Sequence, residues 1–199
     1  MKISVFGSGY VGLVQAAVLA EVGHDVLCMD IDEKKIALLR QGHVSIFEPG
    51  LASLVRDSLE AKRLQFTTDE KLAVQHGQVL FIAVGTPSRD DGSADLSYVM
   101  SVGDAVARHR EQPVILAEKS TVPVGTGDAL RAHIDNCLVK IGRELQFDIV
   151  SNPEFLKEGS AVADCRRPDR IIIGFERGEV REVMRDLYAP FHRPDERVM

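Results

Sequence analysis

The sequence predicts an α/β fold, a doubly wound parallel sheet with helices covering both faces. The first reason is order: short β-rich runs alternate with longer amphipathic segments along the chain, which is typical of parallel strands joined by crossover helices. The second reason is composition. The runs VLFIAV (79–84) and VILA (114–117) are apolar almost throughout, as in central strands that are buried on both faces.

Each expected element follows from this alternation. The β-rich runs predict strands at 2–6, 25–30, 64–68, 78–84, 113–119, 147–151 and 170–175. Segments of helical length and pattern predict helices at 10–22, 32–41, 50–63, 96–109, 125–141 and 178–189. The 199 residues are enough for one sizeable domain with its own core.

Composition excludes several classes of protein. Hydrophobic residues make up 45% and charged residues 27% of the chain, as in ordinary globular proteins. The formal net charge of -6 provides no general attraction to nucleic acid or to an anionic membrane, so we expect neither as a partner. The N-terminal MKISVFGSG lacks the long apolar core of a signal peptide, and no run reaches transmembrane length. We therefore expect a cytoplasmic protein.

The three cysteines, Cys28, Cys137 and Cys165, are odd in number and show no CxxC spacing. This pattern predicts neither a zinc site nor a disulfide framework, and we expect no metal. Cys28 lies in the apolar run DVLCM and Cys137 in a helical segment, where a small buried hydrophobic residue is the usual role. All three are expected to be reduced thiols.

A glycine-rich turn follows the first expected strand. In FGSGYVG, Gly7, Gly9 and Gly12 have GxGxxG spacing, directly after KISVF and directly before a helix. This context is the dinucleotide fingerprint of a Rossmann-like fold, because the glycines allow a tight turn and close backbone approach to a pyrophosphate. The N-terminus of the helix then offers free N–H groups to the phosphates.

The expected second strand ends in Asp30, 21 residues after Gly9. A carboxylate at this position accepts hydrogen bonds from the adenosine ribose hydroxyls and repels a 2′-phosphate, so it favours NAD over NADP. Lys35 lies close enough to reach the adenosine side. The alternative is a turn without a ligand, an aspartate that only caps the next helix and a solvated surface lysine.

Two further loops leave the carboxyl ends of strands, one at 85–87 and one at 120–127. Ligands of open α/β sheets bind outside these ends, so the hydroxyls of Thr86, Ser120 and Thr121 are candidate cofactor contacts. A threonine in a turn is more often a local cap than a ligand, and this alternative remains open for these hydroxyls.

Several blocks together resemble the UDP-glucose 6-dehydrogenases and other nucleotide-sugar dehydrogenases. In order and spacing the blocks are FGSGYVG, EPGL (48–51), GTP (85–87), ADLSYV (94–99), EKSTVPVGT (118–126), NPEFLKEGSA (152–161) and RPDRIIIG (167–174). The resemblance spans the whole chain, and NPEFL followed by a glutamate is its most family-specific block.

The resemblance implies roles for individual residues. Tyr10 and Val11 join the glycines as cofactor contacts, and Thr121 is catalytic as well as cofactor-binding. Glu154 lies beside the reacting carbon, as acid/base or as the group that orders the hydrolytic water, and Glu158 lies near the nicotinamide. Substrate contacts fall on the segment of Glu154, Phe155, Leu156, Lys157 and Glu158. From the residues alone, the alternative is that FLKEGSA starts a helix with solvated Lys157 and Glu158.

The same resemblance implies that the chain is part of a longer enzyme. The family oxidises its sugar twice through a cysteine in a GGxC-type block far downstream of NPEF, with a lysine and an asparagine at the same centre. None of the three cysteines here stands in such a block, and Cys165 occupies a variable position. We expect residues 1–199 to be the NAD-binding domain, without the central dimerisation helix and the C-terminal sugar-binding domain.

The expected function is therefore the NAD-binding half of a homodimeric or larger enzyme that oxidises UDP-glucose to UDP-glucuronate in two NAD-dependent steps. The chain alone is expected to bind NAD without turnover. Alternatives are a dehydrogenase of GDP-mannose or of a UDP-N-acetyl sugar, a two-electron hydroxyacid-type dehydrogenase, and a non-catalytic NAD-responsive module.

Overall fold

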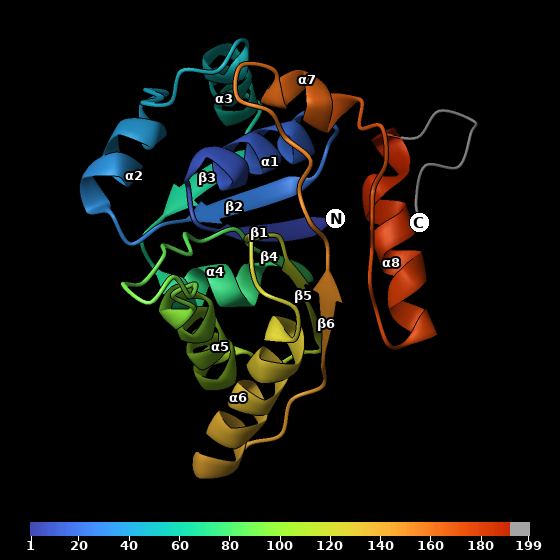
Figure 1. Cartoon of the computed structure of the whole chain (residues 1–199). Coiled ribbons are helices and arrows are strands. Elements are labelled where there is room, and N and C mark those ends of the chain that lie inside the picture. The colour runs from blue at the N-terminus through green and yellow to red at the C-terminus, as the bar shows by residue number, and fades with distance from the viewer. Residues whose placement is uncertain (192–199) are drawn as a thin grey trace.

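A six-stranded parallel sheet forms the centre of the computed structural model, which describes residues 1–191 (Figure 1). Its strand order is β3-β2-β1-β4-β5-β6, the order of a Rossmann fold, with the switch point between β1 and β4. Residues 192–199 of the expected domain lie outside the described part. The strands are β1 Lys2–Phe6, β2 Asp25–Met29, β3 Leu64–Thr67, β4 Val79–Ile82, β5 Val114–Glu118 and β6 Phe147–Ser151.

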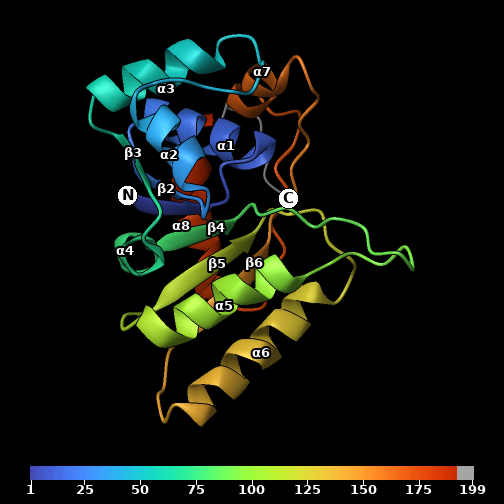
Figure 2. The same ribbon diagram turned by 90° about the vertical axis from the view of Figure 1, so that its left-hand side faces the viewer.

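Helices cover both faces of the sheet, as the sequence predicts (Figures 1 and 2). On one face lie α1, α2, α3 and α7, with α8 packed into the same core; α4, α5 and α6 cover the other face. Their bounds are α1 Tyr10–Glu21, α2 Glu33–Arg40, α3 Leu51–Glu60, α4 Glu70–His76, α5 Ser97–His109, α6 Thr126–Lys140, α7 Ala161–Arg166 and α8 Gly178–Tyr188, followed by a 3-10 turn at Ala189–Phe191.

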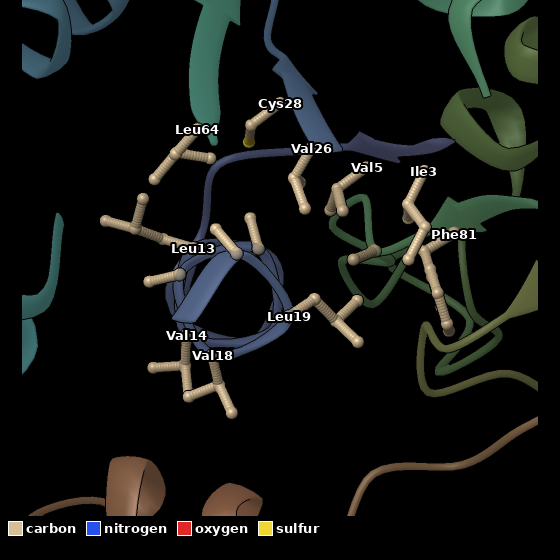
Figure 3. Close-up of a cluster of buried hydrophobic side chains, with 14 of the residues drawn as sticks. Ile3, Val5, Leu13, Val14, Val18, Leu19, Val26, Cys28, Leu64 and Phe81 are labelled. Atoms are coloured by element: carbon tan, nitrogen blue, oxygen red, sulfur yellow. The ribbon is translucent and has the colours of Figure 1, made fainter. Parts of the chain in front are cut away.

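Two hydrophobic cores result, one on each face of the sheet. Figure 3 shows the first, in which Leu13 of α1 extends toward the side of Leu64 and Leu19 toward the side of Phe81. Every residue of α1 from Gly12 to Ala20 is buried, because the sheet, α3 and α7 surround this helix. Almost continuous apolar strands between two cores are what the composition of β4 and β5 predicts.

The expected strand at 170–175 is wrong. Within residues 1–191, no strand forms over this segment, and Gly174 makes an isolated antiparallel bridge to Ser151 of the edge strand β6. The carbonyl of Ile172 instead accepts a hydrogen bond of 2.9 Å from the side-chain amide of Asn152. Ile171 and Ile173 are both buried in the first core, so the apolar run reflects packing and not a strand ladder.

Two short helices, α4 and α7, were not expected from the sequence. They have seven and six residues, too few to show a helical period. The N-cap of α4 is Asp69, whose carboxylate accepts a hydrogen bond of 3.0 Å from the N–H of Leu72. Over residues 1–191, no helix combines the length and the apolar character that crossing a membrane requires.

Asn152 joins β6 to two later segments, and its replacement tests this junction. Its side chain is 1% exposed, donates to Ile172 and accepts from the hydroxyl of Tyr188. Asn152→Ala removes both bonds and leaves buried polar groups with fewer partners, so we expect the free energy of unfolding to fall by about 2–4 kcal/mol. The exposed Asn136→Ala in α6 is the control, expected to change stability by less than about 1 kcal/mol. Equal losses in urea titrations of the two variants would contradict the role of Asn152.

Candidate functional site

The carboxyl ends of the strands meet at one edge of the sheet, and the largest concentration of predicted site residues lies there. A cavity of about 290 Å³ opens beside the switch point between β1 and β4. It is lined by the glycine turn, the end of β2, the loop after β4 and one side of α5: Phe6, Gly7, Gly9, Met29, Asp30, Ile31, Lys35, Glu70, Ala83, Val84, Gly85, Tyr98, Ser101, Val102 and Ala105.

The glycine turn is formed by close backbone contacts. Gly7 has a φ of +97°, and a Cβ placed on it would lie 2.4 Å from the carbonyl oxygen of Ala83. A Cβ on Gly12 would lie 2.0 Å from the carbonyl oxygen of Gly7. Around Gly9 no atom lies within 4 Å of such a Cβ, so this glycine faces open space at the start of α1. The turn therefore brings free N–H groups of a helix N-terminus to the cavity wall.

Asp30 is fixed at the end of β2 by the same turn. Its Oδ2 accepts hydrogen bonds from the N–H of Ser8 at 2.8 Å and from the hydroxyl of Ser8 at 2.6 Å, and its Oδ1 accepts from the N–H of Asp32 at 3.1 Å. Burial opposes ionisation, but these hydrogen bonds and the ammonium of Lys35, 3.5 Å away, lower the pKa of Asp30. The carboxylate is thus charged and oriented toward the cavity that the glycines line.

Ser8 was missed by the sequence analysis. It occupies a variable position of GxGxxG, so the motif alone gives no sign that its hydroxyl and N–H hold Asp30. Asp30 does not cap α2, because the N-cap is Asp32, whose carboxylate accepts from the N–H of Lys35 at 3.0 Å. The capping alternative for Asp30 is therefore wrong.

The loops after β4, β5 and β6 are linked by predicted site residues. The hydroxyl of Thr86 donates to the carbonyl oxygen of Thr121 at 2.7 Å, and the hydroxyl of Thr121 donates to the carboxylate of Glu154 at 3.0 Å. Ser120 donates to the carbonyl oxygens of Ile82 and Val84. The structure thus brings Thr121 and Glu154 together. The hydroxyls of Thr86 and Ser120 instead donate to backbone carbonyl oxygens of neighbouring segments.

Tyr10 points away from the cavity, toward the segment that carries the two glutamates. Its hydroxyl donates to the buried carboxylate of Glu48 and approaches the carbonyl oxygen of Lys157 at 3.3 Å. Glu48 also accepts from the N–H of Gly159 at 2.9 Å and from the N–H of Val162 at 3.5 Å. Burial opposes ionisation of Glu48, yet these donors lower its pKa. Glu48 therefore ties the start of α1 to the loop after Glu154.

The segment from Glu154 to Ser160 is not helical, since a turn occupies 158–160 and α7 begins at Ala161. The alternative in which FLKEGSA starts a helix is therefore wrong. Leu156 packs on the first core, whereas Lys157 and Glu158 are exposed. Phe155 is 43% exposed, and the centroid of its ring lies 4.7 Å from Cζ of Arg170. Val11 is partly buried against the same core as Leu156.

A second, smaller hollow is lined by Glu154 and contains a buried lysine. It is lined by Gln15, Lys119, Asn152, Pro153, Glu154, Phe155, Leu156, Asp164, Cys165, Pro168, Arg170, Ile171 and Tyr188. Lys119 is 5% exposed, and its ammonium donates to the carbonyl oxygen of Asn152 at 3.4 Å. Burial lowers the pKa of Lys119, which the negative charge of Glu154 counteracts. The sequence analysis missed this residue, because nothing local distinguishes a buried lysine from a solvated one.

Cys165 lies in this hollow, where burial raises the pKa of its thiol to about 11. It is protonated at neutral pH and therefore a poor nucleophile. This agrees with the expectation that Cys165 does not take the role of the family's catalytic cysteine.

The chain is similar to known proteins along almost its whole length. The family model described as the NAD binding domain of the UDP-glucose/GDP-mannose dehydrogenase family matches residues 1–192. The chain is 48% identical over 199 residues to a UDP-glucose 6-dehydrogenase of Pseudomonas aeruginosa, covering 100% of this chain and 44% of that relative. It is 43% identical over 193 residues to the UDP-glucose 6-dehydrogenase TuaD of Bacillus subtilis, covering 97% of this chain and 41% of that relative.

Solved structures show the same fold. The UDP-glucose dehydrogenase of Pyrobaculum islandicum superposes with a TM-score of 0.90 at 38% identity, covering 99% of this chain and 45% of that one. A ternary complex of GDP-mannose dehydrogenase from Pseudomonas aeruginosa gives a TM-score of 0.89 at 36% identity, covering 95% of this chain and 44% of that one. The chain therefore spans less than half the length of these relatives.

Glu118, at the end of β5, predicts a pH dependence of stability. Its carboxylate is 6% exposed, its Oε1 has no hydrogen-bond partner among residues 1–191, and burial raises its pKa to about 7. The unfolded chain releases this proton at lower pH than the folded chain, so the group destabilises the fold as pH rises from about 4.5 to about 7.

Glu118→Gln removes this titrating group, so we expect the variant to be more stable than the parent at about pH 8. The difference in free energy of unfolding between variant and parent should grow by about 1–3 kcal/mol from about pH 5 to about pH 8. Urea titrations at both pH values measure the effect. Glu111→Gln, at an exposed position, is the control. A stability difference that does not change with pH would show that Glu118 ionises normally.

Proposed function

Since the chain belongs to the UDP-glucose/GDP-mannose dehydrogenase family, we propose that residues 1–199 are the NAD-binding domain of a longer UDP-glucose 6-dehydrogenase. The whole enzyme oxidises UDP-glucose to UDP-glucuronate in two NAD-dependent steps. By itself the chain binds NAD and does not turn over the sugar, because the reactive cysteine of the family lies in a block that the chain does not contain.

The observation that carries the proposal is the position of Asp30 beside the glycine turn. Its carboxylate is charged, is held by Ser8 and Asp32, and lines the cavity with Gly7 and Gly9. These groups fit NAD, since the open space at Gly9 admits a pyrophosphate to the α1 N-terminus and Asp30 accepts hydrogen bonds from ribose hydroxyls. The bound nicotinamide supplies the hydride acceptor.

On the substrate side, we assign the reaction to the pair of Glu154 and Thr121. Their hydrogen bond of 3.0 Å holds the carboxylate at the carboxyl edge of β5 and β6, where an alcohol proton has to be removed during oxidation. Glu154 acts as the acid/base group or orders the hydrolytic water. Glu158 lies near the nicotinamide, and the segment from Phe155 to Lys157 contacts the substrate.

The remaining cofactor contacts in this proposal are Tyr10, Val11, Gly12, Lys35, Thr86 and Ser120. Lys35 is supported by its place in the cavity wall. The side chain of Tyr10 is engaged with Glu48, so a contact from this residue to NAD runs through its backbone. The whole enzyme is a cytoplasmic homodimer or larger oligomer whose partner is a UDP-sugar, and it binds neither nucleic acid nor membrane.

Another nucleotide sugar is the second candidate substrate. The fold of a GDP-mannose dehydrogenase matches this chain about as well as that of a UDP-glucose dehydrogenase, with TM-scores of 0.89 and 0.90. The higher identities, up to 48%, are to UDP-glucose 6-dehydrogenases, which favours UDP-glucose. Assays of the whole enzyme with both sugars decide between them.

Asp30→Ala tests the cofactor assignment. Loss of hydrogen bonds to a charged group is expected to weaken NAD binding by about 1–3 kcal/mol, while removal of the negative charge reduces the discrimination against NADP. Calorimetric titration of the parent and the variant with both cofactors measures these effects. Asp57→Ala, at an exposed position of α3, is the matched control. Equal affinity of the parent chain for NAD and NADP would refute the role of Asp30.

Glu154→Gln tests the catalytic assignment in the full-length enzyme. The amide keeps the size of the side chain and its contact with Thr121 but cannot accept a proton, so we expect kcat to fall by about 10² to 10⁴-fold with NAD affinity unchanged. Steady-state kinetics and NAD titration separate the two effects. Glu144→Gln, at a position outside the site, is the control. Unchanged turnover of the Glu154 variant would rule out an acid/base role.

A further inference from the structure

We propose that Asp104, His133 and Cys137 form a binding site for one divalent metal ion of the Zn²⁺ class, which links α5 to α6. The three side chains offer one ligand atom each, and these atoms lie within 4.8 Å of one another. The proposal is independent of the proposed function, since none of the three residues belongs to the predicted NAD or sugar site.

The ligands converge because of the helix geometry. His133 and Cys137 are four residues apart in α6 and therefore project from the same face of that helix. Asp104 comes from the facing side of α5. Its Oδ1 lies 2.8 Å from Nε2 of His133 and 3.2 Å from Sγ of Cys137, and these two atoms are 3.8 Å apart.

Close packing of the two helices holds this arrangement in place. Gly103, next to Asp104, lies where a Cβ would approach Leu130 at 2.9 Å and Ile134 at 3.1 Å. Leu130 and Ile134 belong to the second hydrophobic core, and both are fully buried. The three ligand side chains therefore come from two closely packed helices and not from a loop.

The distances suit a tetrahedral metal better than a catalytic triad. For Zn²⁺ bonds of about 2.0–2.3 Å, tetrahedral geometry puts nitrogen and oxygen about 3.4 Å apart and sulfur about 3.6 Å from either. Asp104 now accepts hydrogen bonds from the other two residues, and each observed distance is within about 0.6 Å of these values, so small side-chain shifts bring the three atoms to ligand positions. In a Cys-His-Asp triad, the thiol and the carboxylate bind opposite ring nitrogens. Here both approach Nε2 of His133, as ligands around one point do.

The local charges leave the site accessible to a cation. The side chains of His133 and Asp104 are 34% and 44% exposed, so a water molecule can complete a four-coordinate shell. Two cations are near the cluster: Arg108 acts on Asp104 but pairs with Glu70 at 3.2 Å, and Lys140, at the end of α6, acts on Cys137. One imidazole, one thiolate and one carboxylate are typical ligands of Zn²⁺, and the thiolate disfavours Mg²⁺ and Ca²⁺.

Calorimetric titration of the chelator-treated chain with Zn²⁺, in a reductant without thiols, tests the proposal. We expect one ion per chain. His133→Ala and Cys137→Ser should each weaken binding by at least about 100-fold, since loss of even an outer partner of a metal ligand typically costs 10 to 100-fold. His109→Ala is the matched control: it removes a histidine of α5 that pairs with Glu70 but has no neighbouring thiol, and its Zn²⁺ affinity should equal that of the parent.

Titration with Co²⁺ adds a readout that a purely structural role would not change. Binding through Cys137 should produce a sulfur-to-cobalt charge-transfer band in the parent and in His109→Ala, and no such band in Cys137→Ser. Circular dichroism checks that each variant is folded, and Asp104→Asn provides a further folded variant with a weakened ligand. Absence of binding with one ion per chain, or binding that persists in both Cys137→Ser and His133→Ala, would overturn the proposal.

Discussion

The site depends on one steric constraint, the contact of three backbone segments at the switch point of the sheet. A Cβ on Gly12 would meet the carbonyl oxygen of Gly7 at 2.0 Å, and a Cβ on Gly7 would meet that of Ala83 at 2.4 Å. Neither contact can be relieved by a side-chain rotation, because the atoms that would be struck belong to the backbone. Any larger residue would separate β1 from α1 or from β4 and so displace the helix N-terminus that faces the cavity. The hydrogen bonds of Ser8 to Asp30 start from this turn, so the position of the carboxylate depends on the same constraint.

A second link, through Glu48, connects the cofactor side to the segment of Glu154. The carboxylate accepts hydrogen bonds from Tyr10 at the start of α1 and from the N–H groups of Gly159 and Val162. Apart from Tyr10, these donors are backbone groups, so the link holds the path of the loop and not particular side chains within it. A buried carboxylate that lost these donors would be costly, which means that the loop and the glycine turn are held in a fixed relation to each other.

The sequence predicts those parts of the structure that have a local pattern. The alternation of apolar runs and amphipathic segments predicts the six strands observed in residues 1–191 and six of the helices. GxGxxG with Asp30 predicts the cofactor end of the site. The strand expected at 170–175 was wrong, because burial of Ile171 and Ile173 produces the same apolar run as a sheet. Ser8, Glu48 and Lys119 could not be predicted, since each matters through a partner far along the chain. Asp104 could not be predicted either, because it lies far from His133 in the sequence. The spacing of His133 and Cys137 is the one local sign of this cluster.

The two sides of the site are built differently, and this difference bears on what the chain can do. The cofactor side uses backbone N–H groups and a carboxylate held by three hydrogen bonds. The substrate side uses side chains on loops, where the bond between Thr121 and Glu154 is exposed to solvent. Proton transfer to a carboxylate is effective when water is excluded and the substrate is held in place. In the proposed reaction, Glu154 therefore needs a surface that excludes water, whereas the binding role proposed for Asp30 does not depend on one. This asymmetry fits the proposed division, in which this chain binds NAD and another part of a longer enzyme covers the reacting sugar.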